Sequence, residues 1–372
     1  MEKTARFFEG FSLGLLIIAF VAIQVLIGGT RMVFSLPSYA LVGVVGLVAI
    51  FSVRRMGPAP GTWCLSIATI FFTYILARAY FSPMPYIARS DLYSVLAGLV
   101  VYFYTACILT NARQRMIFIA CLLVLALGHA LVGAIQFRNG DNFMPISWLQ
   151  RYDYQARASG FYVCPNHLAG LVEALGVLGL SIVCWSRLKT WKKLLLGYAV
   201  AVCYVSLVIT GSRGGYLSAI FSLLVFVFLS ALVLRRMRGH LFWSLGGMSI
   251  LVAILLALGV TAAVKKSSYL TSRAENTFEL TNMRLYLWRS ALQQWQVEPI
   301  FGTGAGTFLY YGRLFRNERV QEDPIYVHND YLNLLAEYGL VGAAGLVLFL
   351  GAHFYCGLRS FGSLGPKRVA AS

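Results

Sequence analysis

The stretch His328–Gly345 reads HNDYLNLLAEYGLVGAAG and joins a polar cluster directly to an apolar run. Its first residues, His328 to Asp330, are polar, and the helix expected after them runs into a span predicted at 340–358. An apolar helix of roughly 20 residues is long enough to cross a bilayer. The stretch therefore predicts a membrane helix with ionisable groups at its foot. Chemistry is expected there, because ionisable residues are rare on membrane helices and mark functional positions.

The rest of the chain has the composition of a membrane protein. Hydrophobic residues fill 59% of its 372 positions and charged residues only 12%, whereas a soluble domain carries about 25% charged residues. Continuous apolar runs without alternation favour helices over a barrel. We therefore expect an all-α polytopic membrane protein with about ten transmembrane helices. The predicted spans are 10–29, 36–53, 62–81, 91–110, 116–136, 167–186, 193–210, 215–234, 241–264 and 340–358.

The net charge of +17 is a signal of topology more than of nucleic-acid binding. Basic residues gather in short connections between spans, and cytoplasmic connections of membrane proteins carry an excess of Lys and Arg. This pattern predicts that both termini are cytoplasmic. The basic residues assigned to the inside are Lys3, Arg6, Arg54, Arg55, Arg113, Arg115, Arg187, Lys189, Lys192, Lys193, Arg235, Arg236, Arg238, Arg359, Lys367 and Arg368.

Three polar segments interrupt the apolar pattern, and the predicted topology places all of them outside. They are residues 137–166, the TGSRGG connection at 210–215 and a long extracytoplasmic loop at 265–335. Within the long loop, MRLYLWRSALQQWQV predicts an amphipathic helix whose one face carries Arg284, Trp288, Ala291/Leu292 and Trp295. The cytoplasmic connections are too short for a catalytic domain. Any chemistry is therefore expected at the outer face.

Arginines in these segments are candidates for binding an anion. Arg213 lies between two spans in GSRGG, where its planar guanidinium suits a phosphate or carboxylate and the glycines let a bulky anion approach the backbone. The alternative is an interfacial arginine whose side chain reaches the lipid headgroups. Arg284 and Arg289 either add positive charge to the same site or point outward at the interface.

His328 is the candidate general base. The positive end of a helix dipole favours the neutral form of a nearby histidine, and a neutral imidazole can accept a proton from a hydroxyl. The alternative is a structural histidine at a helix cap. No metal is predicted, because Glu322, Asp323, His328 and Asp330 match no familiar ligand spacing and no Asp-x-Asp occurs in the chain. No cofactor is predicted either, since GTGAG lacks the context of a nucleotide-binding loop.

Four motifs, taken in order, resemble the O-antigen ligase and O-antigen polymerase family. They are RASGFYVCPNHLAG at 157–170, GSRGGYLS at 211–218, RLYLWRSALQQWQVEPIFGTGAGTF at 284–308 and HNDYLNLLAEYGLVG at 328–342. The resemblance covers residues 155–350 and divides the chain into N-terminal transmembrane helices at 1–136 and a ligase-like region at 137–372. It implies a membrane glycosyltransferase of the GT-C type, in surface polysaccharide and lipopolysaccharide biosynthesis.

The family's reaction gives the site residues their expected roles. A glycan on undecaprenyl pyrophosphate passes to an acceptor hydroxyl at the outer face of the bacterial inner membrane, with inversion and without a metal. By resemblance, Arg213 and Arg284 hold the pyrophosphate and His328 activates or orients the hydroxyl. Arg157, Arg289 and Asp330 are expected to bind substrate.

Several alternatives stay open at the level of sequence. The acceptor is lipid A core in a ligase, another glycan in a polymerase or a protein Ser/Thr in an O-oligosaccharyltransferase, and ligase or polymerase is favoured. A rival of another class is a transporter or flippase of lipid-linked glycans. A transporter is expected to show repeated halves and paired broken helices, whereas the polar motifs here gather in the second half.

Overall fold

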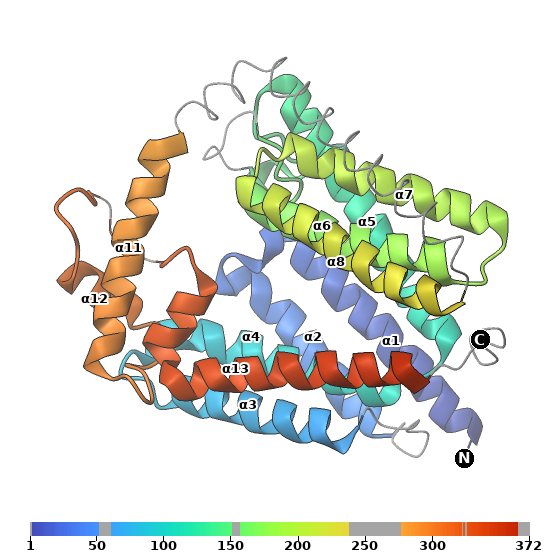
Figure 1. The fold of residues 1–372 in the computed structure, drawn as a ribbon, viewed down its shortest axis with the longest axis horizontal. Coiled ribbons are helices and arrows are strands. Elements are labelled where there is room, and N and C mark those ends of the chain that lie inside the picture. Colours follow the sequence, from blue (N-terminus) through green and yellow to red (C-terminus); the bar gives the residue numbers. More distant parts are fainter. Residues whose placement is uncertain are drawn as a thin grey trace. The chain divides into compact units, whose positions relative to one another are not determined.

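The computed structural model describes residues 2–51, 61–150, 157–237, 277–321, 323 and 326–363. Every regular element in these ranges is a helix, which confirms the predicted all-α class (Figure 1). The α-helices are α1 (Glu2–Val25), α2 (Met32–Ile50), α3 (Thr62–Tyr80), α4 (Pro85–Phe103), α5 (Ala112–Asn139), α6 (Pro165–Trp185), α7 (Thr190–Ile209), α8 (Arg213–Met237), α11 (Thr277–Val297), α12 (Phe308–Leu314) and α13 (Asp330–Ser363). Short helical turns are η1 (Ile27–Gly29), η3 (Tyr104–Ile108) and η4 (Ser147–Leu149).

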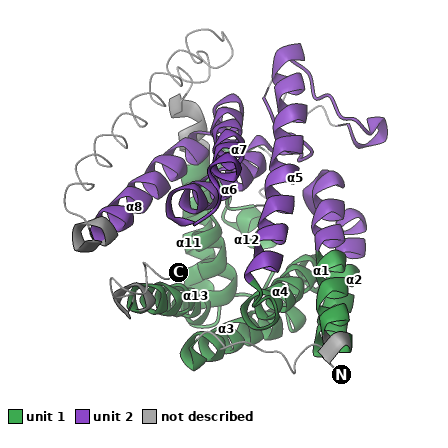
Figure 2. Ribbon diagram, turned by 90° about the vertical axis from the view of Figure 1, so that its right-hand side faces the viewer, with its two compact units in different colours: residues 1–16, 39–111, 274–363 green, residues 17–38, 112–273, 364–372 purple. Residues whose placement is uncertain are grey.

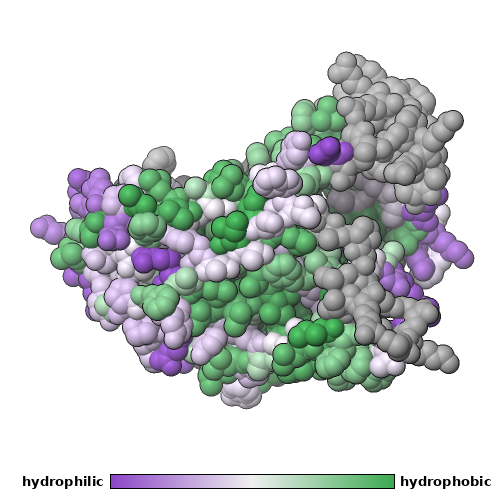
Figure 3. Space-filling model, turned by 90° about the horizontal axis from the view of Figure 1, so that it is seen from below, coloured by the Kyte–Doolittle hydropathy of each residue, from purple (hydrophilic) through white to green (hydrophobic). Residues whose placement is uncertain are grey.

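Among the described helices, nine are long and apolar enough to cross a membrane, namely α1 to α8 and α13. Their outward surfaces carry large apolar side chains such as Trp63, Leu131 and Leu217, which are 76%, 65% and 70% exposed. The face drawn in Figure 3 is accordingly rich in hydrophobic residues. Lipid can cover such a surface, and the polytopic prediction is confirmed. The tenth predicted span, 241–264, lies outside the described residues.

The chain divides into two compact units (Figure 2). Unit 1 comprises residues 1–16, 39–111 and 274–363, and unit 2 comprises residues 17–38, 112–273 and 364–372. Each unit is thus assembled from separate stretches of sequence. The predicted boundary between residues 136 and 137 falls within unit 2, and that division of the chain stays a prediction.

In unit 2, α6 packs against α5, α7 and α8. Small residues allow the close approach: a Cβ added at Gly179 would lie 2.6 Å from a side-chain methyl of Val200. Because lipid is as apolar as leucine, helices in membranes associate through such tight packing. The core of the bundle includes Leu168, Val172 and Cys203, which are fully buried.

In unit 1, α13 packs along α3, and α3 packs on α4. Phe71 of α3 stacks on Phe349 of α13 with ring centroids 5.7 Å apart. His353 Nδ1 donates to the Phe349 carbonyl at 2.7 Å, so its Nε2 accepts the Tyr102 hydroxyl of α4, also at 2.7 Å. The helices α11 and α12 pack on each other and on α13. The helix α11 contains the amphipathic helix predicted within the loop 265–335, whereas α12 was not predicted individually.

Candidate functional site

His328 stands immediately before α13, in a backbone conformation that is unusual for a residue with a Cβ. Its φ is +54°, and such strained positions in proteins cluster at functional sites. Asn329 caps the helix, because its Oδ1 accepts the N–H groups of Tyr331 at 3.1 Å and of Leu332 at 3.2 Å. Asp330 is the first helical residue, where a negative charge suits the helix dipole.

The imidazole of His328 is influenced by Arg284 of α11. Burial and then the positive charge of Arg284 lower the pKa of His328, while the Asp330 carboxylate opposes them by raising it. Both lowering effects disfavour the imidazolium form. His328 is therefore mainly neutral at pH 7, which is the protonation state that a general base requires. The structure thus brings three of the predicted site residues together in unit 1.

The buried face of α11 consists of Leu287, Ser290, Ala291 and Gln294, spaced as one helical stripe. Gln294 is fully buried, and its Nε2 donates to the hydroxyls of Thr303 at 2.7 Å and Thr307 at 3.0 Å. Arg284 and Arg289 are exposed. Of the predicted face, Ala291 is buried, both tryptophans are partly buried, and Leu292 is exposed like Arg284. The burial of Gln294 was not anticipated, because a glutamine resembles a surface residue in sequence.

The glycine-rich turn after α11, residues 299–307, folds onto a kink in α13. Gly302, Gly304 and Gly306 have φ of +74°, +108° and +71°, and the kink is at Gly339, with φ +67° and ψ −169°. The turn and the kink exchange backbone hydrogen bonds: Thr303 and Gly304 donate to the carbonyls of Ala336 and Glu337 at 3.2 and 2.9 Å, and Leu340 and Val341 donate to those of Pro299 and Ile300 at 2.9 and 3.1 Å. The turn therefore satisfies backbone groups that the kink frees.

Side chains of α3 and of the connection to α4 hold the same turn. Tyr74 donates to the Phe301 carbonyl at 3.1 Å and Arg78 donates to that of Gly302. Ser82 donates to the Ala305 carbonyl at 2.7 Å. Sequence reasoning missed these residues, because the resemblance began only near residue 155. An arginine within a predicted span was the available signal.

Glu337 is a second residue that sequence reasoning missed. It lies on α13 just before the kink and is only 3% exposed. Its Oε1 accepts the Phe308 N–H at 3.0 Å, and its Oε2 accepts an N–H of the Asn333 amide at 3.1 Å. Its neighbour Tyr338 donates to the Asp91 carboxylate of α4 at 2.9 Å. The foot of α13 is thus tied to α4 and α12.

In unit 2, Arg157 joins two of the predicted polar segments. It is 4% exposed, its Nε donates to the Thr210 carbonyl at 2.9 Å, and a terminal N–H donates to Asn166 Oδ1 at 3.3 Å. The adjacent Ala158 N–H donates to the Ile209 carbonyl at 3.3 Å. These contacts hold the 157–170 motif against the end of α7. The role of Arg157 in binding substrate stays a prediction.

Arg213 is the first residue of α8 and is partly exposed. Gly211, with φ +61°, ends α7, and Ser212 caps α8 by accepting the Gly215 N–H at 3.2 Å. A Cβ on Gly215 would lie 2.7 Å from that of Ala169 on α6, so glycine is needed there for close packing. The motif GSRGG therefore builds a tight turn that presents Arg213 at a helix N-terminus, where backbone N–H groups favour anions.

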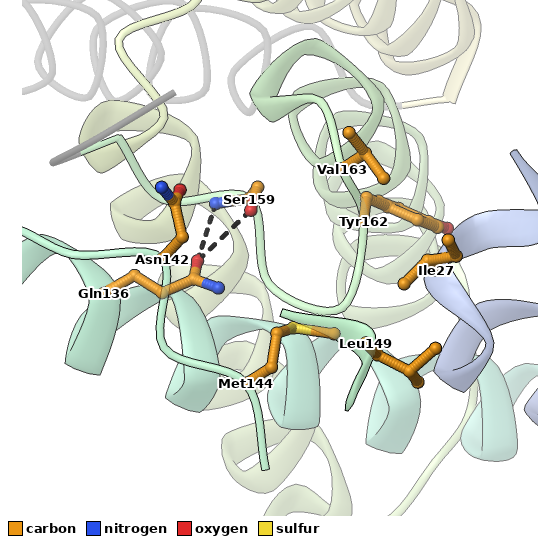
Figure 4. A pocket seen from close by; sticks show the side chains of 8 residues that line it. All are labelled: Ile27, Gln136, Asn142, Met144, Leu149, Ser159, Tyr162 and Val163. Carbon is orange, nitrogen blue, oxygen red and sulfur yellow. Dashed lines mark hydrogen bonds between the residues drawn. The ribbon is translucent and has the colours of Figure 1, made fainter. Parts of the chain in front are cut away.

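The loop before α6 closes over Gln136 of α5 (Figure 4). The Oε1 of Gln136 accepts the N–H groups of Ser159 and Gly160 at 2.9 and 3.0 Å, and its Nε2 donates to the Phe143 and Gly160 carbonyls. A small pocket beside it is also lined by Asn142 and Tyr162. The side-chain amide of Gln136 already has backbone hydrogen-bond partners on both its oxygen and its nitrogen. We therefore interpret these residues as holding the loop in place.

A family model described as O-antigen ligase matches residues 198–347. These residues are similar to the O-antigen ligase family. The match covers three of the four motifs, those at 211–218, 284–308 and 328–342, and supports the resemblance there. It also supports a glycan-transferring role in surface polysaccharide biosynthesis. No curated protein and no solved structure gives a significant match.

The stretch that matches the O-antigen ligase model contains Arg213, Arg284, Arg289, His328 and Asp330. Arg284, His328 and Asp330 lie together in unit 1, where Arg289 is exposed away from the buried stripe of α11. Arg213 belongs to unit 2, so the joint anion site predicted for it with Arg284 stays a prediction. Arg157 precedes the matched stretch.

No cluster of three or more metal-ligating side chains occurs among the residues that the structure describes. Glu322, one of the four acidic or imidazole groups considered at sequence level, lies outside the described residues. That the protein acts without a metal or a cofactor stays a prediction.

Proposed function

We propose that this protein transfers a glycan from undecaprenyl pyrophosphate to an acceptor hydroxyl at the outer face of the bacterial inner membrane, with both termini in the cytoplasm. The observation that carries the proposal is the arrangement at the foot of α13 within the stretch that matches the O-antigen ligase model. There, burial and Arg284 keep the pKa of His328 low, so that the imidazole can take a proton at neutral pH.

The proposed reaction is a single displacement. The acceptor oxygen attacks the anomeric carbon of the glycan while its proton passes to His328. The bond between that carbon and the pyrophosphate oxygen breaks, and undecaprenyl pyrophosphate leaves with the electron pair. Attack from the face opposite the leaving group inverts the anomeric configuration.

Arg213 and Arg284 are proposed to meet the charge that develops on the leaving group. Preorganised donors aimed at such charge commonly make the largest contribution to catalysis. The N-terminus of α8, which begins at Arg213, adds backbone N–H groups of the kind that bind phosphate. Arg157, Arg289 and Asp330 are proposed to support substrate binding around this set.

The test is transfer by the purified protein in proteoliposomes containing a glycan on undecaprenyl pyrophosphate. Lipid A core, free glycan and a Ser/Thr peptide are offered in turn, which separates ligase, polymerase and O-oligosaccharyltransferase. We expect a ligase or polymerase product and equal rates with and without a chelator. Movement of the donor across the vesicle membrane without any product would support a flippase and refute the proposal.

Variants assign the roles within that assay. His328→Ala is expected to lower the rate about 10²–10⁴-fold, the usual contribution of acid–base catalysis, and Arg213→Ala about 10²–10³-fold, as for loss of one charge-stabilising donor. Lys192→Ala is the matched control, because Lys192 is exposed on α7 and rests on Trp191. Full transfer by both site variants would eliminate this mechanism.

A further inference from the structure

Glu337 is a buried acid whose two carboxylate oxygens both accept hydrogen bonds from fixed donors. Oε1 accepts the N–H of Phe308, the first residue of α12, and Oε2 accepts from the Asn333 amide one turn earlier in α13. The N–H groups at a helix start have no partner within their own helix. Glu337 therefore anchors the beginning of α12 to the foot of α13.

Phe308 connects this anchor to the candidate base. Its side chain is 1% exposed and packs in one cluster with Val327, Ala291 and Ala336. Val327, also 1% exposed, directly precedes His328. Ala291 lies on α11 two turns after Arg284, and residues seven apart share a face of a helix. One packed cluster thus joins the segments that carry the base and the arginine.

We propose that Glu337 is a positioning residue that sets the place of His328 relative to Arg284. The inference rests on the proposed function, because it concerns the precision with which the base meets the acceptor hydroxyl. Glu337 acts through Phe308 and Val327. Its contribution is therefore made through the hydrogen bonds from Phe308 and Asn333.

A positioning role and a chemical role predict different results for glutamine at position 337. The Gln Oε1 can accept the Phe308 N–H, and its Nε2 can donate to Asn333 once the Asn333 amide turns over. Both hydrogen bonds then persist without a carboxylate. Alanine removes both bonds and leaves the Phe308 N–H buried without a partner. A group that transfers a proton would be lost equally in the two variants.

The Asn333 contact allows a matched swap of donor and acceptor. Asn333→Asp replaces the amide donor by a second acid, so the buried pair must take up a proton before one oxygen can donate to the other. Combining it with Glu337→Gln restores a donor opposite an acceptor, because the Gln Nε2 can donate to the Asp oxygen. The double variant is therefore expected to be more active than Asn333→Asp alone.

The experiment measures kcat and the KM for donor in the proteoliposome assay for Glu337→Gln, Glu337→Ala, Asn333→Asp and the double variant. Glu337→Ala is expected to lose about 10²-fold in kcat, the loss typical of about 1 Å of misplacement, with a smaller change in KM. Glu337→Gln is expected to stay near wild type. Equal losses in the Gln and Ala variants, or no recovery in the double variant, would overturn the inference.

A second readout needs no transfer activity. The rate at which diethyl pyrocarbonate modifies His328 is followed against pH by mass spectrometry of the peptide that contains it. Glu337→Ala is expected to shift this profile and Glu337→Gln to leave it in place. If wild type transfers no glycan, the proposed function fails, while the modification profile still decides whether Glu337 positions His328. An unshifted profile in Glu337→Ala refutes the positioning role.

Discussion

The kink of α13 depends on Gly339, and replacing this residue by alanine should be costly. Its φ of +67° and ψ of −169° lie in a region that is essentially restricted to glycine, and such conformations cost about 1–3 kcal/mol for other residues. A Cβ there would also lie 2.5 Å from the Gly302 nitrogen and would clash with the Ile300 carbonyl oxygen. Overpacking of this kind adds about 1–3 kcal/mol.

Together these effects predict that Gly339→Ala lowers the free energy of unfolding by about 2–6 kcal/mol, the sum of the two ranges. The neighbour that must move is backbone, so relaxation by a side chain offers little relief. Because proteins are typically stable by only about 5–15 kcal/mol, much of the purified variant should be unfolded or inactive.

The assay is unfolding of the purified protein in mixed micelles with increasing sodium dodecyl sulfate, followed by circular dichroism. Gly351→Ala is the control within the same helix, because a Cβ there has no neighbour within 4 Å. Alanine in a helix interior is more stabilising than glycine by about 0.5–1 kcal/mol, so Gly351→Ala should not lower the free energy of unfolding. If Gly339→Ala proved as stable as Gly351→Ala, the account of the kink and the glycine-rich turn would be refuted.

Two further predictions concern the base and the α7–α8 turn. Arg284→Gln removes a positive charge that lowers the pKa of His328, so the acid limb of the profile of kcat/KM against pH should move to higher pH. A limb that stays in place or moves down would contradict the role of Arg284. Gly215→Ala should lower the free energy of unfolding by about 1–3 kcal/mol, because the added Cβ would clash with Ala169. Gly214→Ala, with open space around its Cβ, should not, and equal stability of the two variants would argue against close packing at this turn.

The membrane helices and the polar residues 328–330 before α13 were predictable, because both depend only on the local order of apolar and polar residues. Apolar runs of sufficient length specify spans irrespective of their neighbours, and a His-Asn-Asp sequence before such a run indicates a capped helix. Asn329 makes the cap, and His328 stands where the sequence placed it. The effect of Arg284 on the pKa of His328 was not predicted, because the neutral form of His328 was attributed to the helix dipole and Arg284 was assigned only to the pyrophosphate.

The support of the site was not predictable, because it depends on partners far apart in sequence. Glu337 and Gln294 look like polar positions on helices, and only the fold shows them buried among backbone groups. The glycines at 302, 304 and 306 permit a tight turn. That its N–H groups bond to the kink at Gly339 follows from a pairing that no local pattern encodes.

The bonds from α3 and α4 to the far end of the chain bear on how such proteins can diversify. Tyr74, Arg78 and Asp91 meet partners between residues 301 and 338. A gene crossover that imported only the C-terminal third would separate these pairs. The residues that must be inherited together are therefore discontinuous in sequence. A working chimaera must take α3, α4 and the stretch that contains His328 from the same parent protein.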